Sequence, residues 1–167
     1  GIGPVLEARD ALSVLRNDVE APRDLRNRAL DLAGALLDVA PGATSGGGRA
    51  LACTLLDNGA ALAKFLAICE AQGGFTEPVL APHTRPVFAG RTGRIQSVDN
   101  RRLARVAKLA GAPASAAAGI DCRLRIGDGV KTGEPLFEVH AQSPGELEYA
   151  MAYALAHPDI LEIEAGS

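Results

Sequence analysis

The sequence predicts an α+β protein in which a helical segment precedes a mixed domain of short strands and helices. Three observations support this prediction. Apolar residues recur with helical spacing as far as Gly74. The composition then changes over Phe75–Pro86, which contains three prolines and is typical of an extended linker. Beyond it, short apolar runs bounded by glycine alternate with helical patterns, as in α+β domains.

Length and composition limit the class of function. The chain has 167 residues, 47% of them hydrophobic, which is enough for a real core. A net charge of −3 and scattered arginines argue against nucleic acid as a partner. No apolar run reaches the length of about 18 residues that a membrane helix needs. Cysteines 53, 69 and 122 form no Cys-x-x-Cys pair, which favours free, buried thiols in a cytoplasmic protein.

Two helices are expected before residue 40. Pro4 suits the first turn of one, and Asn17 and Asp18 end it. Its apolar face is Ala8, Ala11, Leu12 and Leu15. Pro22 opens the second, and its inward face is expected to be Leu25, Ala29, Leu32, Ala33 and Leu36. The residues Pro41–Gly48 are expected to form a loop.

Two more helices are expected before the linker. One runs from about Arg49 to Leu56 and ends at Asp57-Asn58-Gly59. The next ends at Gln72-Gly73-Gly74 and carries one apolar stripe: Leu62, Phe65, Leu66 and Cys69. The abrupt start at Gly1-Ile2-Gly3-Pro4, without a methionine, leads us to expect a processed product or a piece of a longer chain.

After the linker we expect strands at Val87–Ala89 and Gly93–Val98, then a helix over Asn100–Ala110 capped by Asp99. The inward face of this helix is Leu103, Val106, Ala107 and Ala110. Ser143 and Pro144 begin a last helix that ends at His157, with Leu147, Ala150, Met151 and Ala154 inward. A final strand is expected over Asp159–Ala165 with Leu161 and Ile163 on one face.

The stretch Gly119–Ala141 organises this second half. Cys122, Leu124 and Ile126 alternate with arginines, which predicts a half-buried strand, and Leu136–Val139 is a second strand-like run. Two tight turns separate the runs, at Gly127-Asp128-Gly129 and Lys131-Thr132-Gly133. Val130 stands between the turns as an apolar plug for the core. We therefore expect domains over 1–76 and 87–167, joined by a linker over 77–86.

No candidate site stands out from the residues alone. Ser45–Arg49 is glycine-rich before a helix but lacks a Gly-Lys-Ser/Thr ending, so a connector is favoured over a phosphate loop. His83, His140 and His157 lack metal-ligand spacing, and His140 is expected on the polar side of a strand beside Glu138. Glu7 and Asp10 on the first helix suggest a solvated or ion-paired face. The sequence thus predicts no catalytic, cofactor-binding or metal-ligating residue.

The pattern Gly127-Asp-x-Val-x-x-Gly-x-Pro-Leu136 resembles the hammerhead half-barrel of biotinyl and lipoyl carrier domains. A carrier needs an exposed lysine at the tip of the hairpin, where this chain has His140-Ala141-Gln142-Ser143. Its lysines are Lys64, Lys108 and Lys131, and the last lies in the wrong turn. A swinging-arm function is therefore disfavoured. A standalone hammerhead-type binding or interaction module stays open as the alternative function.

Several segments together resemble the thymidine/pyrimidine nucleoside phosphorylase family, in the long-form branch related to AMP phosphorylase. They are Gly3–Leu12, Leu56–Gly59 with Ala71–Gly74, Gly93–Ile95, Gly119-Ile120, and Gly127–Leu136 with His140-Ala141. The resemblance implies that the helical segment is a remnant of the large α/β domain. It also implies that the C-terminal α+β domain is a mainly antiparallel half-barrel.

The resemblance implies a pentosyltransferase that uses phosphate to cleave a pyrimidine nucleoside into free base and pentose 1-phosphate. The family's Lys-His-Ser-Thr-Gly-Gly phosphate loop is absent from these residues, as are its base-gripping arginine, serine and lysine. We therefore carry over no catalytic residue and expect a structural, domain-closing role for this portion, inactive alone. Implied partners are phosphate and nucleoside, with no cofactor, nucleic acid or membrane; a homodimer stays open.

Overall fold

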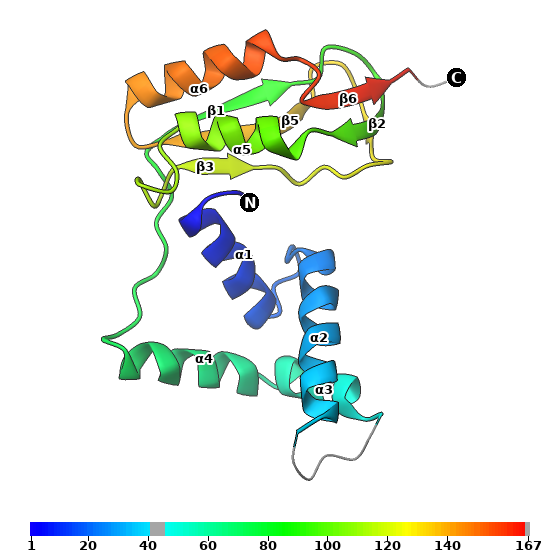
Figure 1. Ribbon diagram of the computed structural model, residues 1–167, viewed down its shortest axis with the longest axis vertical. Coiled ribbons are helices and arrows are strands. Elements are labelled where there is room, and N and C mark those ends of the chain that lie inside the picture. Colours follow the sequence, from blue (N-terminus) through cyan, green and yellow to red (C-terminus); the bar gives the residue numbers. More distant parts are fainter. Residues whose placement is uncertain (41–45, 166–167) are drawn as a thin grey trace. The chain divides into compact units, whose positions relative to one another are not determined.

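In the computed structural model, which describes residues 1–40 and 46–165, the chain is an α+β protein, as predicted (Figure 1). It divides into two compact units. One is the helical stretch Ala8–Glu77, and the other joins Gly1–Glu7 to the chain from Pro78 onward. The first seven residues therefore pack with the strands, because Ile2 forms a β-bridge with Ile120.

The four helices expected in the first part of the chain are confirmed. They are α1 (Pro4–Leu15), α2 (Arg23–Asp38), α3 (Gly48–Asp57) and α4 (Ala60–Ala71). Asn17 follows α1 with a φ of 57°, a left-handed conformation that asparagine tolerates, and Gly59 with a φ of 80° separates α3 from α4. Within the described residues, a membrane-spanning length of apolar helix is reached only by α3 and α4 together, across a bend of 74°.

The predicted inward face of α2 is wrong. Leu30 and Gly34 are the buried residues of this helix, whereas Leu25, Leu32 and Leu36 are 39%, 57% and 71% exposed. Backbone proximity explains the difference. A Cβ added to Gly34 would lie 2.7 Å from the Arg49 Cα on α3, so α2 approaches α3 along its glycine side.

The outward face of α2 is consequently apolar. Its residues follow each other at intervals of four and three, which is the spacing of a helix-packing seam: Leu25, Ala29, Leu32, Leu36 and Val39. The inner face packs instead in a small cluster with α3, whose buried members are Val14, Leu30, Ala52 and Leu56. Helix α2 thus carries two apolar faces, and the described part of its unit buries one of them.

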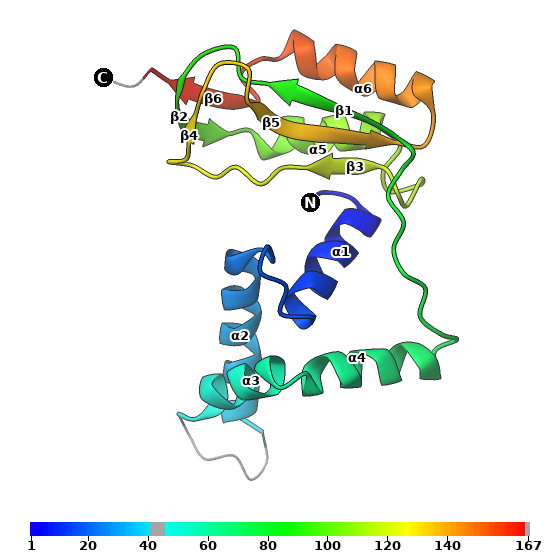
Figure 2. The same ribbon diagram turned by 180° about the vertical axis from the view of Figure 1, so that it is seen from behind.

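The second unit contains two antiparallel three-stranded sheets. One has the order β1-β5-β3, made of β1 (His83–Phe88), β5 (Pro135–Ala141) and β3 (Gly119–Asp121). The other has the order β4-β2-β6, made of β4 (Gly129–Val130), β2 (Gly93–Val98) and β6 (Leu161–Glu164). Helices α5 (Asn100–Leu109) and α6 (Pro144–Ala156) pack on the same face of the first sheet (Figures 1 and 2).

Strand β1 begins at His83, so the last four residues of the range expected as linker, 77–86, belong to the sheet. Pro86 lies inside this strand opposite Glu138. Proline lacks an N–H, but an edge strand needs only one side paired, and β1 is the edge of its sheet. Of the three prolines that predicted a linker, Pro86 therefore lies in an edge strand.

Both helices of this unit follow the sequence prediction closely. The Asp99 carboxylate caps α5 by accepting from the backbone N–H groups of Arg101 and Arg102. Ser143 and Glu146 form a reciprocal capping box at the start of α6. All eight predicted inward residues of the two helices are buried: Leu103, Val106, Ala107, Ala110, Leu147, Ala150, Met151 and Ala154. They join the core with Ile120 and Val139.

For the stretch Gly119–Ala141, the predicted first strand is wrong, whereas the predicted turns and the plug are confirmed. Residues 122–126 form no strand, and Ile126 is 68% exposed; the paired segment is β3, which ends at Asp121. The turns are confirmed, because Gly127 and Gly133 have φ of 95° and 83°. The plug is also confirmed, since Val130 is buried in the core. The arginine alternation misled because Cys122 and Leu124 are partly buried without pairing in a ladder.

We expect Gly93→Ala to destabilise the second unit by about 1 to 3 kcal/mol. An added Cβ would lie 2.0 Å from the Glu164 backbone oxygen, so β2 and β6 would have to separate. Urea unfolding measures the loss. Gly129→Ala on β4 is the matched control, because its Cβ would meet no atom closer than 4.0 Å. Equal stability of the two variants would contradict this close approach.

The two faces of α2 lead to a second prediction. Leu30→Ala should lower the free energy of unfolding of the helical unit by about 2 to 5 kcal/mol, because Leu30 is buried. Leu36→Ala should change it by less than about 0.5 kcal/mol. Circular dichroism at increasing urea concentration compares the pair. A larger loss for Leu36→Ala would mean that the sequence-predicted face is the packed one.

Candidate functional site

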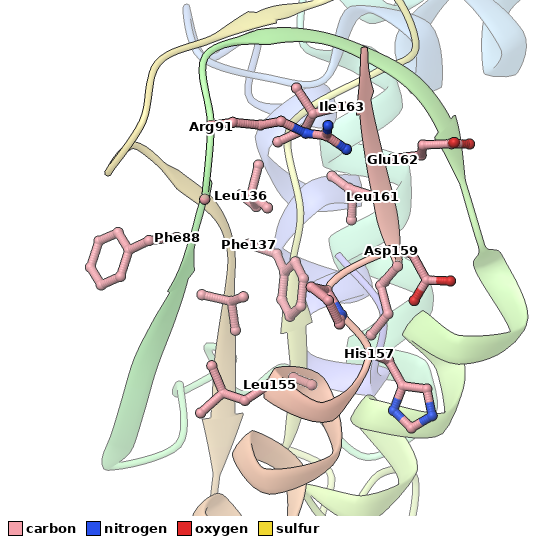
Figure 3. A pocket seen from close by; sticks show the side chains of 15 residues that line it. Phe88, Arg91, Leu136, Phe137, Leu155, His157, Asp159, Leu161, Glu162 and Ile163 are labelled. Atoms are coloured by element: carbon pink, nitrogen blue, oxygen red, sulfur yellow. The ribbon is translucent and has the colours of Figure 1, made fainter. Parts of the chain in front are cut away.

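A cavity of about 440 Å³ opens in the second unit between β1 and β6 (Figure 3). Leu136 and Phe137 of β5 form its floor, and Leu161 and Ile163 of β6 line one side. Helix α6 contributes Leu155. The cavity exists because β1 and β6 are edge strands of different sheets and do not pair with each other. Its size falls within the range of small-ligand sites.

Charged groups surround this apolar cavity. Arg91, in the loop between β1 and β2, extends its guanidinium towards β6 in Figure 3. Asp159 and Glu162 lie on the other side, and both carboxylates are already engaged. Arg102 Nη1 lies 2.6 Å from Asp159 Oδ2, and Ser97 Oγ donates to Glu162 Oε2 at 3.0 Å. Within the described chain, Arg91 makes no hydrogen bond or ion pair.

The ion pair sets the charge of Asp159. The hydrogen bond from Arg102 lowers the pKa of the Asp159 carboxyl below its ordinary value of 3.8, and the nearby positive charge of Arg102 acts in the same direction. The carboxyl is therefore ionised at neutral pH. Because the Arg102 and Asp159 side chains are 35% and 64% exposed, solvent screens the pair, which links the start of α5 to the turn between α6 and β6.

The structure does not bring the three histidines together. His83 and His140 pair with adjacent positions of neighbouring strands, so their side chains point to opposite faces of the sheet. His157 caps α6, where its Nδ1 lies 2.8 Å from the Tyr153 carbonyl oxygen and its ring stacks on that of Tyr153. No shared ligand or proton-transfer geometry results.

The expectation that His140 lies on a polar strand face is wrong. Its side chain is buried, with Nε2 3.4 Å from Glu138 Oε2. Residues 139–141 are buried consecutively, because β5 is the central strand and both its faces are covered. The alternation of Glu138 with its apolar neighbours predicted one solvent-exposed face of the strand, and at this end of the sheet no such face exists. The proximity to Glu138 was predicted correctly.

The backbone N–H groups at the start of α3 bind a carboxylate of this same chain. Asp38 Oδ1 accepts from the backbone N–H groups of Gly46 and Gly48, at 3.0 and 2.8 Å. The start of α3 therefore has an internal carboxylate where an external anion would bind. This agrees with the connector interpretation for residues 46–49, while Ser45 and the loop residues before it lie outside the described residues.

The remaining candidates have structural contacts. Glu7 accepts a hydrogen bond from the Gly3 N–H, and the Lys131 backbone N–H donates to Glu134 within its turn. The three cysteines are free thiols, and burial raises the pKa of Cys122. No group of three or more metal-ligating side chains occurs in residues 1–40 and 46–165.

Sequence reasoning missed the cavity and its residues. Phe88 and Leu155 line it and are 55% and 67% exposed, and neither falls in a recognisable motif. Gly90 next to Arg91 signalled only a turn. The cavity arises from two strands that are 73 residues apart, since β1 ends at Phe88 and β6 begins at Leu161. Only the register of the two sheets places them around one space.

Comparison with known proteins gives a consistent result over the chain. Residues 94–160 match the pyrimidine nucleoside phosphorylase C-terminal domain. All 167 residues align with a protein of Hahella chejuensis named "Putative thymidine phosphorylase" at 54% identity, covering 33% of that protein. A protein of the same name from Polaromonas sp. is 53% identical over 163 residues, 98% of this chain and 32% of the relative. The chain spans about a third of the curated relatives it matches.

The ion pair at the cavity makes a testable prediction. Carbon-detected NMR titration should place the pKa of Asp159 below 3.8, and Arg102→Gln should raise it towards that value. Since the folded-state pKa is the depressed one, stabilisation by the pair is complete above the unfolded-state pKa. It is lost as the pH falls through the lower, folded-state value. Arg105→Gln, an exposed arginine on α5, is the control and should leave Asp159 unchanged.

Proposed function

Because this chain belongs to the thymidine/pyrimidine nucleoside phosphorylase family, and is similar to its C-terminal portion, we propose that it forms part of a thymidine phosphorylase. The longer protein would cleave a pyrimidine nucleoside with phosphate, giving the free base and a pentose 1-phosphate. The observation that carries this proposal is the identity above 50% along the whole chain, across both units.

In this reaction phosphate attacks the sugar as the bond to the base breaks, so catalysis depends on holding phosphate and nucleoside on opposite faces of the sugar. The positive charge that develops on the sugar has to form between these two bound groups. Nothing in the reaction requires a cofactor. We propose phosphate and pyrimidine nucleoside as the small-molecule partners of the longer protein.

The role we propose for this portion is structural, including support of domain closure. Two observations favour it. The candidate polar groups are dispersed: His83 and His140 face opposite sides of a sheet, and His157 caps a helix. The glycine-rich loop is bound by Asp38 rather than open to an anion. The groups that act on phosphate and base would then come from residues outside this chain.

The exposed apolar face of α2 fits a scaffold role. Leu32 and Leu36 are more than half exposed, and apolar faces of this spacing pack against other helices or sheets. We propose that further polypeptide of the longer protein, or a second copy, covers this face. We also propose that the boundary between the two portions lies in the extended segment before β1, and that the protein is cytoplasmic.

The test is a phosphorolysis assay. The purified 167-residue chain, incubated with thymidine and phosphate, should release no thymine, as followed by liquid chromatography. The longer Hahella chejuensis relative, assayed in parallel, should release thymine in a phosphate-dependent way. Thymine release by the chain alone would refute the structural role. A folded relative without phosphorolytic activity on thymidine would count against the proposed reaction itself.

A further inference from the structure

Two edge strands of different sheets line one cavity. Strand β1 ends the sheet β1-β5-β3, and β6 ends the sheet β4-β2-β6. Within the described residues, each pairs on one side only, and residues of both strands line the cavity. An unpaired edge presents backbone N–H and C=O groups that can pair with another extended chain. Pro86 removes one donor from β1, so β6 offers the more complete edge.

The cavity floor is apolar, and its rim is apolar too. Leu136 and Phe137 are buried beneath it, while Phe88 and Leu155 project at its margin with large exposed fractions. The register between β1 and β5 shifts at this point, because Val87 pairs with Phe137 and Phe88 with Pro135. Phe88, which is 55% exposed, lies beside this irregular point in the ladder. The result is a site that accepts an apolar side chain.

The charge at the cavity is unbalanced in favour of an anion. Asp159 is paired with Arg102. Glu162 accepts from Ser97 and points away from the cavity in Figure 3. Arg91, by contrast, points towards β6 without an ion pair or hydrogen bond in the described chain. A guanidinium in this position matches a carboxylate, with which it can form two parallel hydrogen bonds.

We propose that this cavity binds the C-terminal strand of a separate polypeptide whose last residue is apolar. The bound strand lies between β1 and β6 and pairs with the open edge of β6. Its last side chain enters the space above Leu136 and Phe137, and its terminal carboxylate meets Arg91. Strand addition with capture of a terminal carboxylate is an established mode of peptide recognition. A small apolar acid would use Arg91 and the floor but would leave the strand edges unpaired.

The first test compares two peptides that differ in one group. Both have the sequence fluorescein-Gly-Gly-Thr-Val-Thr-Leu; one ends in a free carboxylate and the other in an amide. Fluorescence polarisation with the full 167-residue chain should show the free acid binding about tenfold or more tightly, the factor expected of one charge-assisted hydrogen bond. Equal affinities, or no binding of either peptide up to about 1 mM, would overturn the proposal.

Variants of the chain locate the contact. Arg91→Gln should remove the difference between acid and amide, whereas Arg105→Gln, an exposed arginine on α5, should retain it. Leu155→Asp should weaken both peptides by about tenfold or more, because it places a charge at the apolar rim. Tyr149→Asp is its control, since Tyr149 is 74% exposed on the same helix and lies outside the cavity. Equal effects within either pair would refute the assigned site.

NMR distinguishes a bound strand from a bound acid. The free-acid peptide should shift the backbone amide resonances of β6 as well as those around Arg91. Hexanoate should shift only resonances of the floor and of the Arg91 loop, with weaker binding. If hexanoate reproduces the peptide's affinity and its pattern of shifts, the site is one for small apolar acids, and the strand proposal is wrong.

Discussion

The structure of the second unit depends on the burial of one central strand. Strand β5 pairs with β1 on one side and β3 on the other, and its residues from Val139 to Ala141 are buried without interruption. A strand enclosed in this way needs partners for all its backbone groups, because unpaired buried polar groups are costly. That requirement explains why short segments such as β3 are kept in register beside it. The sheet built around β5 also gives α5 and α6 an apolar surface on which to pack.

The same strand is the floor of the cavity. The two sheets share no described strand, so the space between their edges remains open where Leu136 and Phe137 support it from below. Most polar groups around this space already have partners within the fold: Asp159 forms an ion pair with Arg102, and Ser97 donates a hydrogen bond to Glu162. A unit that satisfies its own charges in this way is suited to positioning other parts of a protein. The proposed structural role follows from this lack of free polar groups, whereas the proposed strand site depends on Arg91, which makes no ion pair or hydrogen bond in the described chain.

The helical unit shows a different balance. Helix α2 is brought against α3 by Gly34 and Gly48, where a Cβ on Gly48 would lie 2.1 Å from the Gly34 carbonyl oxygen. This close backbone approach leaves the leucine-rich face of α2 outside. The relatives, which are about three times as long as this chain, contain polypeptide that could cover such a face. If this unit belongs to a larger domain, as proposed, the leucine-rich face of α2 is the surface that the rest of that domain would cover.

The sequence by itself predicted the helices and their ends, the α+β class and the resemblance to the family. These features depend on local chemistry: Asp99 and Ser143 cap helices wherever those helices pack, and Gly127 and Gly133 supply positive φ without reference to the core. Tertiary structure alone decided which face of α2 is buried, that His140 is enclosed, and that residues 122–126 stay outside the ladder. It also created the cavity. Each of these depends on contacts between segments distant in sequence, and hydrophobic periodicity shows that a face is apolar without showing which neighbour will cover it.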